Sequence, residues 1–227
     1  MNEKKNIAIL YFSRTAAQEI QNKDWSLESR RALSLANVLI DRTRVFLEST
    51  GLPVFHSHEG NQVGNTFGAK LSNAFDSLFE SGFDAVISIG NDSPELDRIN
   101  WDTIIKDLVQ GKCVMGPSIR GGAYLIGLTR ESFRYNEFQA LSWQSSLLSD
   151  SLQKYFLHQG QEVRILEKLR DLNTIFDLKN ARINSSEIGK IILLLLRMLP
   201  PFKTDSIPVK KNHCILKELL RAPPHFT

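Results

Sequence analysis

The sequence predicts an α/β protein whose mixed, mostly parallel sheet is flanked by helices and followed by a helical C-terminal appendage. Short apolar runs, suited to strands buried on both faces, alternate along the chain with segments that carry apolar residues at helical spacing. The composition agrees, because 42% of the 227 residues are hydrophobic and 23% are charged. These are ordinary values for a globular protein, and they exclude a disordered or collagen-like chain.

The first half of the chain contains five expected elements. The run IAILYF is continuously apolar, as in a strand covered by helices, and Gly51 is a plausible stop for the long amphipathic segment before it. The expected elements are a strand at 7–12, a helix at 26–50, a strand at 53–58, a helix at 67–80 and a strand at 84–90.

The second half continues the alternation and then changes character. The expected elements are a helix at 101–110, strands at 112–115 and 123–128, a helix at 143–159 and a strand at 162–166. After about residue 173 only helical patterns remain, at 174–180 and 185–199. We therefore divide the chain into a domain at 1–182 and a helical extension with a tail at 183–227, which is a candidate docking element for a protein partner.

Charge, cysteine use and hydropathy bound the environment of the protein. Lysine plus arginine is 28 and aspartate plus glutamate is 25, for a net charge of +3, so nothing requires a nucleic-acid partner. Cys113 and Cys214 are too few for a disulfide framework or a four-cysteine metal site. No apolar stretch approaches the ~20 residues that span a bilayer, and we expect no transmembrane segment and a cytoplasmic location.

Three loops are the candidate ligand-binding regions. Ligands of open α/β sheets bind beyond the carboxyl ends of the strands, and that rule selects the loops at 13–24, 91–97 and 116–122. All three are expected along one edge of the sheet. No Walker A or Gly-x-Gly-x-x-Gly sequence is present, which disfavours a P-loop ATPase and a Rossmann dehydrogenase.

Two of these loops carry residues that suit an anionic ligand. Asp92 follows a buried strand and could hold a divalent cation, although an aspartate at a strand end also commonly caps a turn. In the third loop, Gly121 and Gly122 would let the backbone approach a ligand, and Arg120 could pair with a phosphate. A tight turn between two strands explains the same glycines. Trp143 is a candidate for the core or for the floor of a pocket.

Between about residues 64 and 178 the chain resembles a known family. The motifs that carry the resemblance are FGAKLSNAF at 67–75, IGNDSPEL at 89–96, GPSIRGGAYLIGL at 116–128, WQSS at 143–146 and DLNT at 171–174. They are similar to those of small glycosyltransferases associated with radical-SAM and selenium proteins, a branch of the nucleotide-diphospho-sugar transferase superfamily with a Rossmann-like, GT-A type fold. The resemblance implies a nucleotide or nucleotide sugar as ligand and Mg²⁺ or Mn²⁺ as cofactor.

The resemblance also implies roles for individual residues. Asp92 matches the acidic position of the motif Gly-Ser-Asp-Cys-Pro, the metal or diphosphate site, and Asp171 matches the first acid of a second motif, Asp-x-Asp-Thr. With Arg120 these are the expected catalytic residues. The expected nucleotide or substrate contacts are Arg14, Lys70, Asn91, Ser93, Gly121, Gly122 and Trp143.

Three departures from the family pattern leave two hypotheses open. The first loop keeps Arg14 in place of a lysine but lacks the family's proline, glycine and Lys-Thr-Arg cluster. Arg120 stands where the family has an aspartate, and Asn173 replaces the second acid of Asp-x-Asp-Thr, which weakens a metal site. The chain is then either a transferase that uses a nucleotide-activated donor, or a member that keeps the fold and binds a nucleotide, a phosphorylated ligand or a protein partner without transfer.

Overall fold

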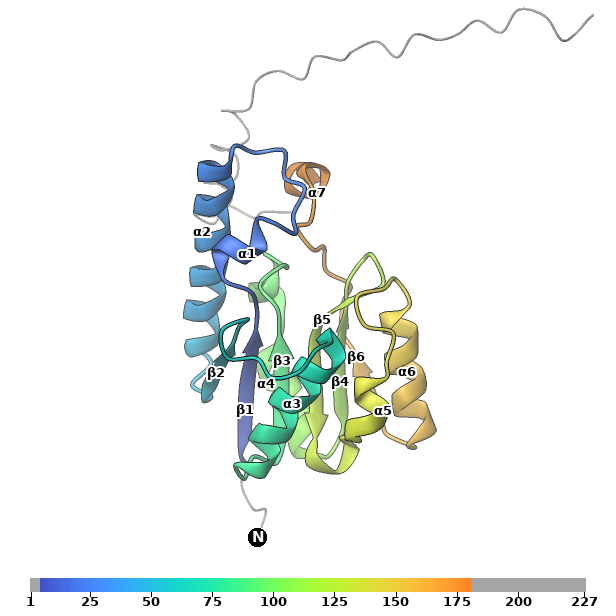
Figure 1. Ribbon diagram of the computed structural model, residues 1–227. Helices are drawn as coiled ribbons and strands as arrows, with labels where there is room; N and C mark the ends of the chain where they lie inside the picture. Colours follow the sequence, from blue (N-terminus) through green and yellow to red (C-terminus); the bar gives the residue numbers. More distant parts are fainter. Residues whose placement is uncertain (1–4, 181–227) are drawn as a thin grey trace, which may run out of the picture.

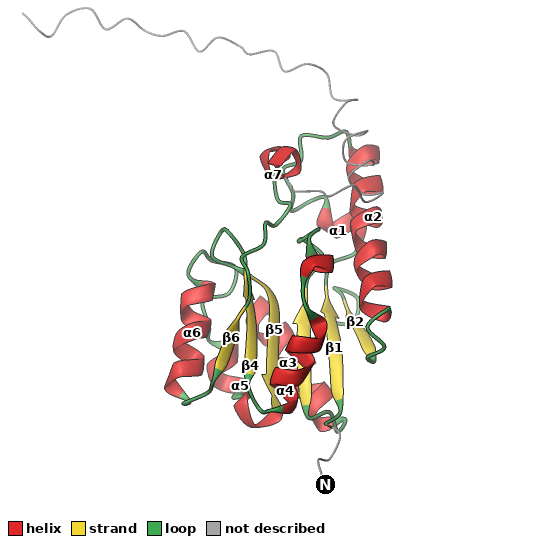
Figure 2. Ribbon diagram, turned by 180° about the vertical axis from the view of Figure 1, so that it is seen from behind, coloured by secondary structure: helices red, strands yellow, loops and turns green. Residues whose placement is uncertain are grey.

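The computed structural model describes residues 5–180, which form a six-stranded sheet with helices on both faces (Figures 1 and 2). The strands are β1 (Ile7–Phe12), β2 (Val54–Ser57), β3 (Ala85–Ile89), β4 (Cys113–Pro117), β5 (Ala123–Thr129) and β6 (Val163–Ile165). The helices are α1 (Ala16–Glu19), α2 (Ser29–Glu48), α3 (Phe67–Glu80), α4 (Trp101–Val109), α5 (Tyr135–Gln139), α6 (Leu148–His158) and α7 (Ile175–Asn180).

The sheet is mixed and mostly parallel, as the sequence predicts. Its order is β2-β1-β3-β5-β4-β6, and β5 alone among these strands runs antiparallel to both of its neighbours. The carboxyl ends of the other five strands therefore meet at one edge. This edge receives the loops at 13–24, 91–97 and 116–122, as the strand order of an open sheet requires.

Two apolar clusters cover the two faces of the sheet. One cluster packs α3, α5 and α6 against the sheet, and the other packs α4 and the end of α2 against the opposite face. Alternate residues of β1 divide between them: Ala8 and Leu10 face the first cluster, while Ile7, Ile9 and Tyr11 face the second. This is why the strand is apolar at every position.

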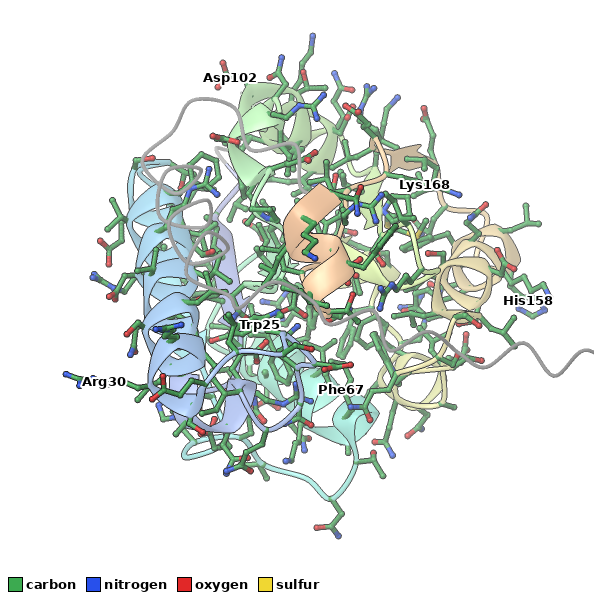
Figure 3. The ribbon with its side chains drawn as sticks, turned by 90° about the horizontal axis from the view of Figure 1, so that it is seen from above. Trp25, Arg30, Phe67, Asp102, His158 and Lys168 are labelled. Atoms are coloured by element: carbon green, nitrogen blue, oxygen red, sulfur yellow. The ribbon has the colours of Figure 1, made fainter. Side chains whose placement is uncertain are left out.

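A third cluster lies above the carboxyl edge and holds the first loop in place. Trp25 is 2% exposed, packs with Leu35, Leu172 and Leu178, and donates its indole N–H to the Leu172 carbonyl oxygen at 2.8 Å. Seen from above in Figure 3, Trp25 lies between α2 and α7. The segment 171–178 is thereby tied to the loop at 13–24, far away in the sequence.

The prediction of one helix at 143–159 is wrong at its start. α6 begins at Leu148, and the residues before it form turns in which Gln144 has a φ of +56°. The first turn of α6 is hydrogen-bonded to the loop at 116–122. Ser149 donates its backbone N–H to the Gly121 carbonyl oxygen at 2.8 Å and its hydroxyl to the Gly122 carbonyl oxygen at 2.6 Å. The short helix α5 is not among the predicted elements.

The predicted helix at 185–199 and the extension at 183–227, with its proposed protein partner, lie outside the described residues. Within residues 5–180 no helix is long and apolar enough to cross a membrane.

Candidate functional site

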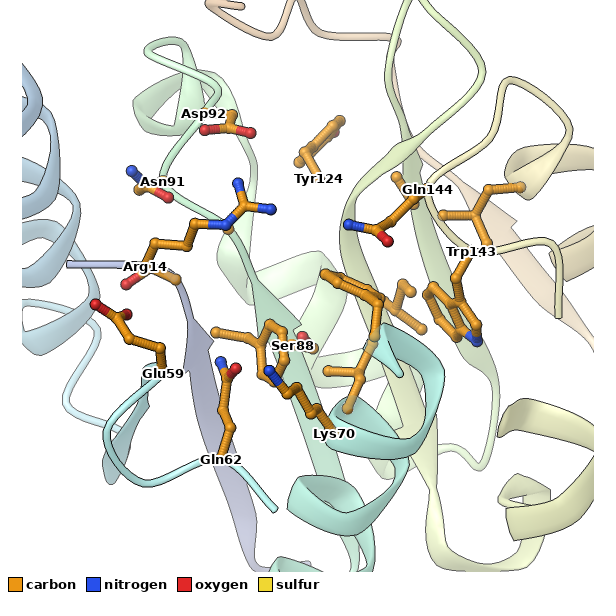
Figure 4. Close-up of a pocket in the computed structure, with 18 of the residues that line it drawn as sticks. Arg14, Glu59, Gln62, Lys70, Ser88, Asn91, Asp92, Tyr124, Trp143 and Gln144 are labelled. Carbon is orange, nitrogen blue, oxygen red and sulfur yellow. The ribbon is translucent and has the colours of Figure 1, made fainter. Parts of the chain in front are cut away.

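A cleft of about 450 Å³ opens at the carboxyl ends of β1 and β3, between the first loop and α3. Its walls come from β1, the first loop, α3, β3, β5 and the turn before α6, segments that the fold alone brings together. Five of the predicted site residues line it: Arg14, Lys70, Asn91, Asp92 and Trp143. Figure 4 labels all five, and four of them, all except Trp143, are polar or charged side chains around an open centre.

Two cationic side chains enter the cleft from different walls. Arg14 comes from the first loop and Lys70 from the first turns of α3, and both extend toward the middle of the cleft (Figure 4). Lys70 forms no salt bridge within residues 5–180, and the contact of Arg14 with Glu19 is long, at 3.8 Å. Both groups are therefore available to an anionic ligand.

A buried ion cluster forms the upper wall of the cleft. The Lys23 ammonium is 2.7 Å from Oδ1 of Asp92, 3.1 Å from Oε1 of Glu19 and 2.6 Å from Oδ1 of Asn173. The side chains of Lys23 and Glu19 are 3% and 2% exposed, whereas that of Asp92 is 38% exposed and reaches the cleft. We call Glu19, Lys23, Asp92 and Asn173 the Lys23 cluster.

The two carboxyl groups of the Lys23 cluster differ in their affinity for protons. Burial, reinforced by the charge of Asp92, raises the pKa of Glu19 to about 7. Burial also opposes ionisation of Asp92, but the Lys23 ammonium outweighs it and lowers the pKa of that carboxyl. Asp92 is therefore the carboxylate of the pair at neutral pH, and Glu19 is the group that exchanges a proton there.

Glu19→Gln is expected to remove a pH dependence of stability. Unfolded Glu19 releases its proton near 4.5 and folded Glu19 near 7, so between these values the folded protein binds more protons. Wild-type stability then falls as pH rises through this window, by on the order of 2 kcal/mol. Urea denaturation of both proteins at pH 5 and pH 8 should show the variant gaining stability relative to wild type at the higher pH.

Glu59→Gln is the control for this measurement. Glu59 also lines the cleft but is exposed; slight desolvation opposes its ionisation, and the hydrogen bonds from Thr15 outweigh this and lower the pKa of its carboxyl. Its ionisation therefore contributes no slope between pH 5 and 8. Equal pH profiles for Glu19→Gln and wild type would show that Glu19 is already ionised at pH 5.

Asn91 presents an unused hydrogen-bond donor beside the cleft. The residue is 5% exposed, and its side-chain Nδ2 has no hydrogen-bond partner within the described residues. Buried amide groups are normally paired, so this unpaired nitrogen is an exception within the described residues. Asn91 lines the cleft, and its expected contact with a substrate stays a prediction.

Trp143 forms the aromatic wall opposite the Lys23 cluster. Its indole N–H donates to the Phe138 carbonyl oxygen at 2.9 Å, and its ring centroid lies 5.5 Å from that of Phe67. A Cβ at Gly68 would lie 2.5 Å from Cδ1 of Trp143 and 2.4 Å from the Gln139 oxygen. Gly68 is thus the residue that allows α3 to pack closely under the tryptophan.

Asp171 and Ser93 lie behind the cleft wall rather than in it. The Ser93 hydroxyl donates to Oδ1 of Asp171 at 3.0 Å, and the Leu172 backbone N–H donates to the backbone carbonyl oxygen of Asp92 at 2.9 Å. Burial, with the charge of Asp92, raises the pKa of Asp171. The two acidic motifs are therefore adjacent in the structure, but of Asp92 and Asp171 only Asp92 lines the cleft.

Arg120 points to a different partner. Its guanidinium lies 2.8 Å from Oδ2 of Asp177, a fully buried carboxylate that also accepts hydrogen bonds from the backbone and hydroxyl of Thr174. Arg120 does not line the cleft. Its charge is used to hold the start of α7, so the structure does not support its expected role beside a leaving diphosphate.

Gly121 and Gly122 are explained by packing. Gly121 has a φ of +83°, and a Cβ there would lie 2.0 Å from the Ser146 oxygen. Gly122 donates its N–H to the Ser118 hydroxyl at 3.1 Å. The tight-turn interpretation is the one the structure favours, and the backbone that Gly121 approaches is the turn before α6 rather than the cleft.

The sequence analysis missed Glu19, Lys23 and Gln144 as site residues. Glu19 and Lys23 lie four residues apart, a spacing that places them on one side of a helical turn, and this was the available signal. Gln144 lines the cleft with a left-handed backbone, a conformation that is uncommon outside glycine and concentrates at functional sites. No sequence signal marks that conformation.

The residues present do not fit the implied Mg²⁺ or Mn²⁺. Within residues 5–180 no three histidine, cysteine, aspartate or glutamate side chains are placed to share a metal ion. The side-chain oxygens of Glu19, Asp92 and Asn173 surround the Lys23 ammonium instead. The position that the resemblance assigns to a divalent cation thus holds a positive side chain.

Comparisons with known proteins agree with the fold class. Residues 48–145 match the model of a family described as an uncharacterized protein conserved in bacteria (DUF2064). No curated protein matches the sequence significantly. The structure is similar to that of a "putative nucleotide-diphospho-sugar transferase" from Desulfovibrio desulfuricans G20, with a TM-score of 0.73 and 19% identity over 85% of this chain and 97% of that one.

Two other solved structures are less similar. Rv0371c from Mycobacterium tuberculosis H37Rv has a TM-score of 0.44 and 12% identity, over 79% of this chain and 98% of that one. A 4-diphosphocytidyl-2C-methyl-D-erythritol synthase from Anaerococcus prevotii DSM 20548 has a TM-score of 0.41 and 11% identity, over 86% of this chain and 97% of that one. The similarity to the Desulfovibrio desulfuricans structure shows the fold, a mixed α/β sheet flanked by helices.

Proposed function

We propose that the protein binds a nucleotide-activated sugar, or a related nucleoside diphosphate donor, in this cleft and transfers a group from it. The observation that carries the proposal is the pair of cationic side chains, Arg14 and Lys70, in a cleft at the carboxyl ends of β1 and β3. A diphosphate is the anion that two separated cations beyond a sheet edge suit best. The nucleotide-diphospho-sugar transferase fold and the resemblance of the acidic motifs support the same class.

The remaining walls of the cleft suit the uncharged parts of such a donor. Gln62 and Gln144 line the cleft and offer amide groups to an oxygen of the base, ribose or sugar. Trp143 and Phe67 provide aromatic surface on which a ring can rest. Asp92 keeps its charge at neutral pH and lies where it can accept a hydrogen bond from an acceptor hydroxyl.

A second candidate function is binding of the same ligand without transfer. Two observations favour it: Arg120 is engaged by Asp177 away from the cleft, and Asp92 is neutralised by Lys23. Such a protein would retain the binding residues Arg14 and Lys70 and lack a group that stabilises the departing diphosphate. A transferase should release product from a bound nucleotide sugar, and a protein that only binds the ligand should not. Measuring this release separates the two candidates.

The test is calorimetric titration of the full-length protein with UDP, GDP, CDP and ADP and with their common sugar conjugates. We expect one base to bind, and Arg14→Ala or Lys70→Ala to weaken that binding about tenfold, since each removes one charge-assisted hydrogen bond. Lys154→Ala is the matched control, because Lys154 lies on α6 outside the cleft. Binding that no variant changes, or no binding by any nucleotide, would contradict the proposal.

A further inference from the structure

The Lys23 ammonium has the surroundings of a bound cation. A lysine ammonium has three N–H donors, and three side-chain oxygens lie within 3.1 Å of this one. They come from the first loop, from the loop after β3 and from the segment before α7. These are the segments that meet at the edge of the sheet where a divalent cation would be expected.

The cluster is closed to an additional cation. Lys23 is 3% exposed and lies among the oxygens, so a metal ion at this position would have to displace the ammonium. A metal ion beside it would meet the repulsion of a fixed positive charge in a poorly solvated site. Two carboxyls and one amide are also few ligands for Mg²⁺, which favours six oxygens at about 2.1 Å.

We infer that the Lys23 ammonium takes the place of a divalent cation at the carboxyl edge of the sheet. The protein would then bind its diphosphate ligand without a metal ion. Lys23 neutralises Asp92 and holds the first loop against the segment 171–173, and the negative charge of the ligand is then met by Arg14 and Lys70 in the cleft. Lys23 is thus a positioning residue, since its ammonium does not line the cleft. The nature of the ligand rests on the proposed function, whereas the substitution of the cation does not.

The first experiment is a titration of the full-length apo protein with Mn²⁺, followed by the electron paramagnetic resonance signal of the free ion. Wild type is expected to have no Mn²⁺ site that depends on Asp92, so Asp92→Asn should leave its Mn²⁺ binding unchanged. Lys23→Ala, which opens space among the three oxygens, is expected to gain one site at least about tenfold tighter than any in wild type. Lys70→Ala removes a lysine that pairs with no carboxylate in the described part of the chain, and it is expected to gain none.

Two results would overturn the inference. One is a wild-type Mn²⁺ site that Asp92→Asn abolishes, and the other is equal gains in Lys23→Ala and Lys70→Ala. If Lys23→Ala does not fold, Asn173→Asp takes its place, because it adds a third carboxylate and leaves Lys23 in position. No Mn²⁺ site in Asn173→Asp supports the substitution, and a site there refutes it.

A second experiment separates this inference from the proposed function. Titrations with UDP, GDP, CDP and ADP in EDTA and in Mg²⁺ are expected to give the same affinity for whichever nucleotide binds. Binding that requires Mg²⁺ would overturn the inference and leave the proposed function standing. Absence of nucleotide binding, together with the expected Mn²⁺ results, would remove the proposed function and leave Lys23 as the resident cation.

Discussion

Gly121→Ala is expected to lower the free energy of unfolding by about 3 kcal/mol, because two costs combine there. The φ of +83° disfavours any side chain, and the new Cβ would lie 2.0 Å from the Ser146 oxygen, in the backbone of the turn before α6. That turn cannot retreat without loosening α6, whose Ser149 N–H donates to the Gly121 oxygen. Urea denaturation of variant and wild type measures the loss.

Gly111→Ala is a matched control for this substitution. Its φ of +87° is close to that of Gly121, but a Cβ there would meet nothing within 4 Å. It should cost about 1 kcal/mol, the backbone strain alone. Equal losses at the two positions would show that the turn at Ser146 moves freely and that the packing explanation of Gly121 is wrong.

Lys23→Met is expected to destabilise the protein by about 3 kcal/mol, since it removes the only charge of the Lys23 cluster that balances its carboxyls while keeping the bulk of the side chain. Glu19 and Asp92 would then face each other with only the more distant guanidinium of Arg14, 3.8 Å from Glu19, as a counter-ion. Asp92→Asn in the same chain should recover part of the loss, because it removes the remaining repulsion. Denaturation of both single variants and the double variant gives the coupling energy.

Lys70→Met provides the comparison for this cycle. Lys70 forms no salt bridge within residues 5–180, so its replacement should change stability by less than about 0.5 kcal/mol. A Lys23→Met variant that is as stable as Lys70→Met, or additive losses in the Lys23 and Asp92 double variant, would mean that the ion cluster contributes little to stability.

Taken together, these variants separate two uses of positive charge in one small region. Lys23 is enclosed by protein oxygens and serves the fold, whereas Arg14 and Lys70 reach the cleft and are available to a ligand. Substitution of the first should therefore be seen in denaturation, and substitution of the other two in ligand affinity. Arg120 belongs with the first group, because its partner Asp177 is fully buried.

The sequence by itself determined all six strands, most of the helices and the edge at which the cleft opens. Continuous apolar runs identified β1 and β3, helical spacing identified α3 with both of its bounds, and the strand ends placed Asp92 at the ligand-binding edge. These features depend on local periodicity, which records burial along the chain and is visible in one dimension. The mostly parallel sheet follows from the same alternation of strands and helices.

Only the tertiary structure decided which charges meet and which glycines pack. Lys23 contacts Asn173, 150 positions away, and Arg120 pairs with Asp177, 57 positions away. Gly121 meets Ser146 because α6 starts later than its amphipathic pattern suggests. Periodicity carries no information on such partners, since they depend on how loops from separate elements fold over the edge of the sheet. The physical reason is that a buried charge must be paired, but many residues along a chain could pair with it.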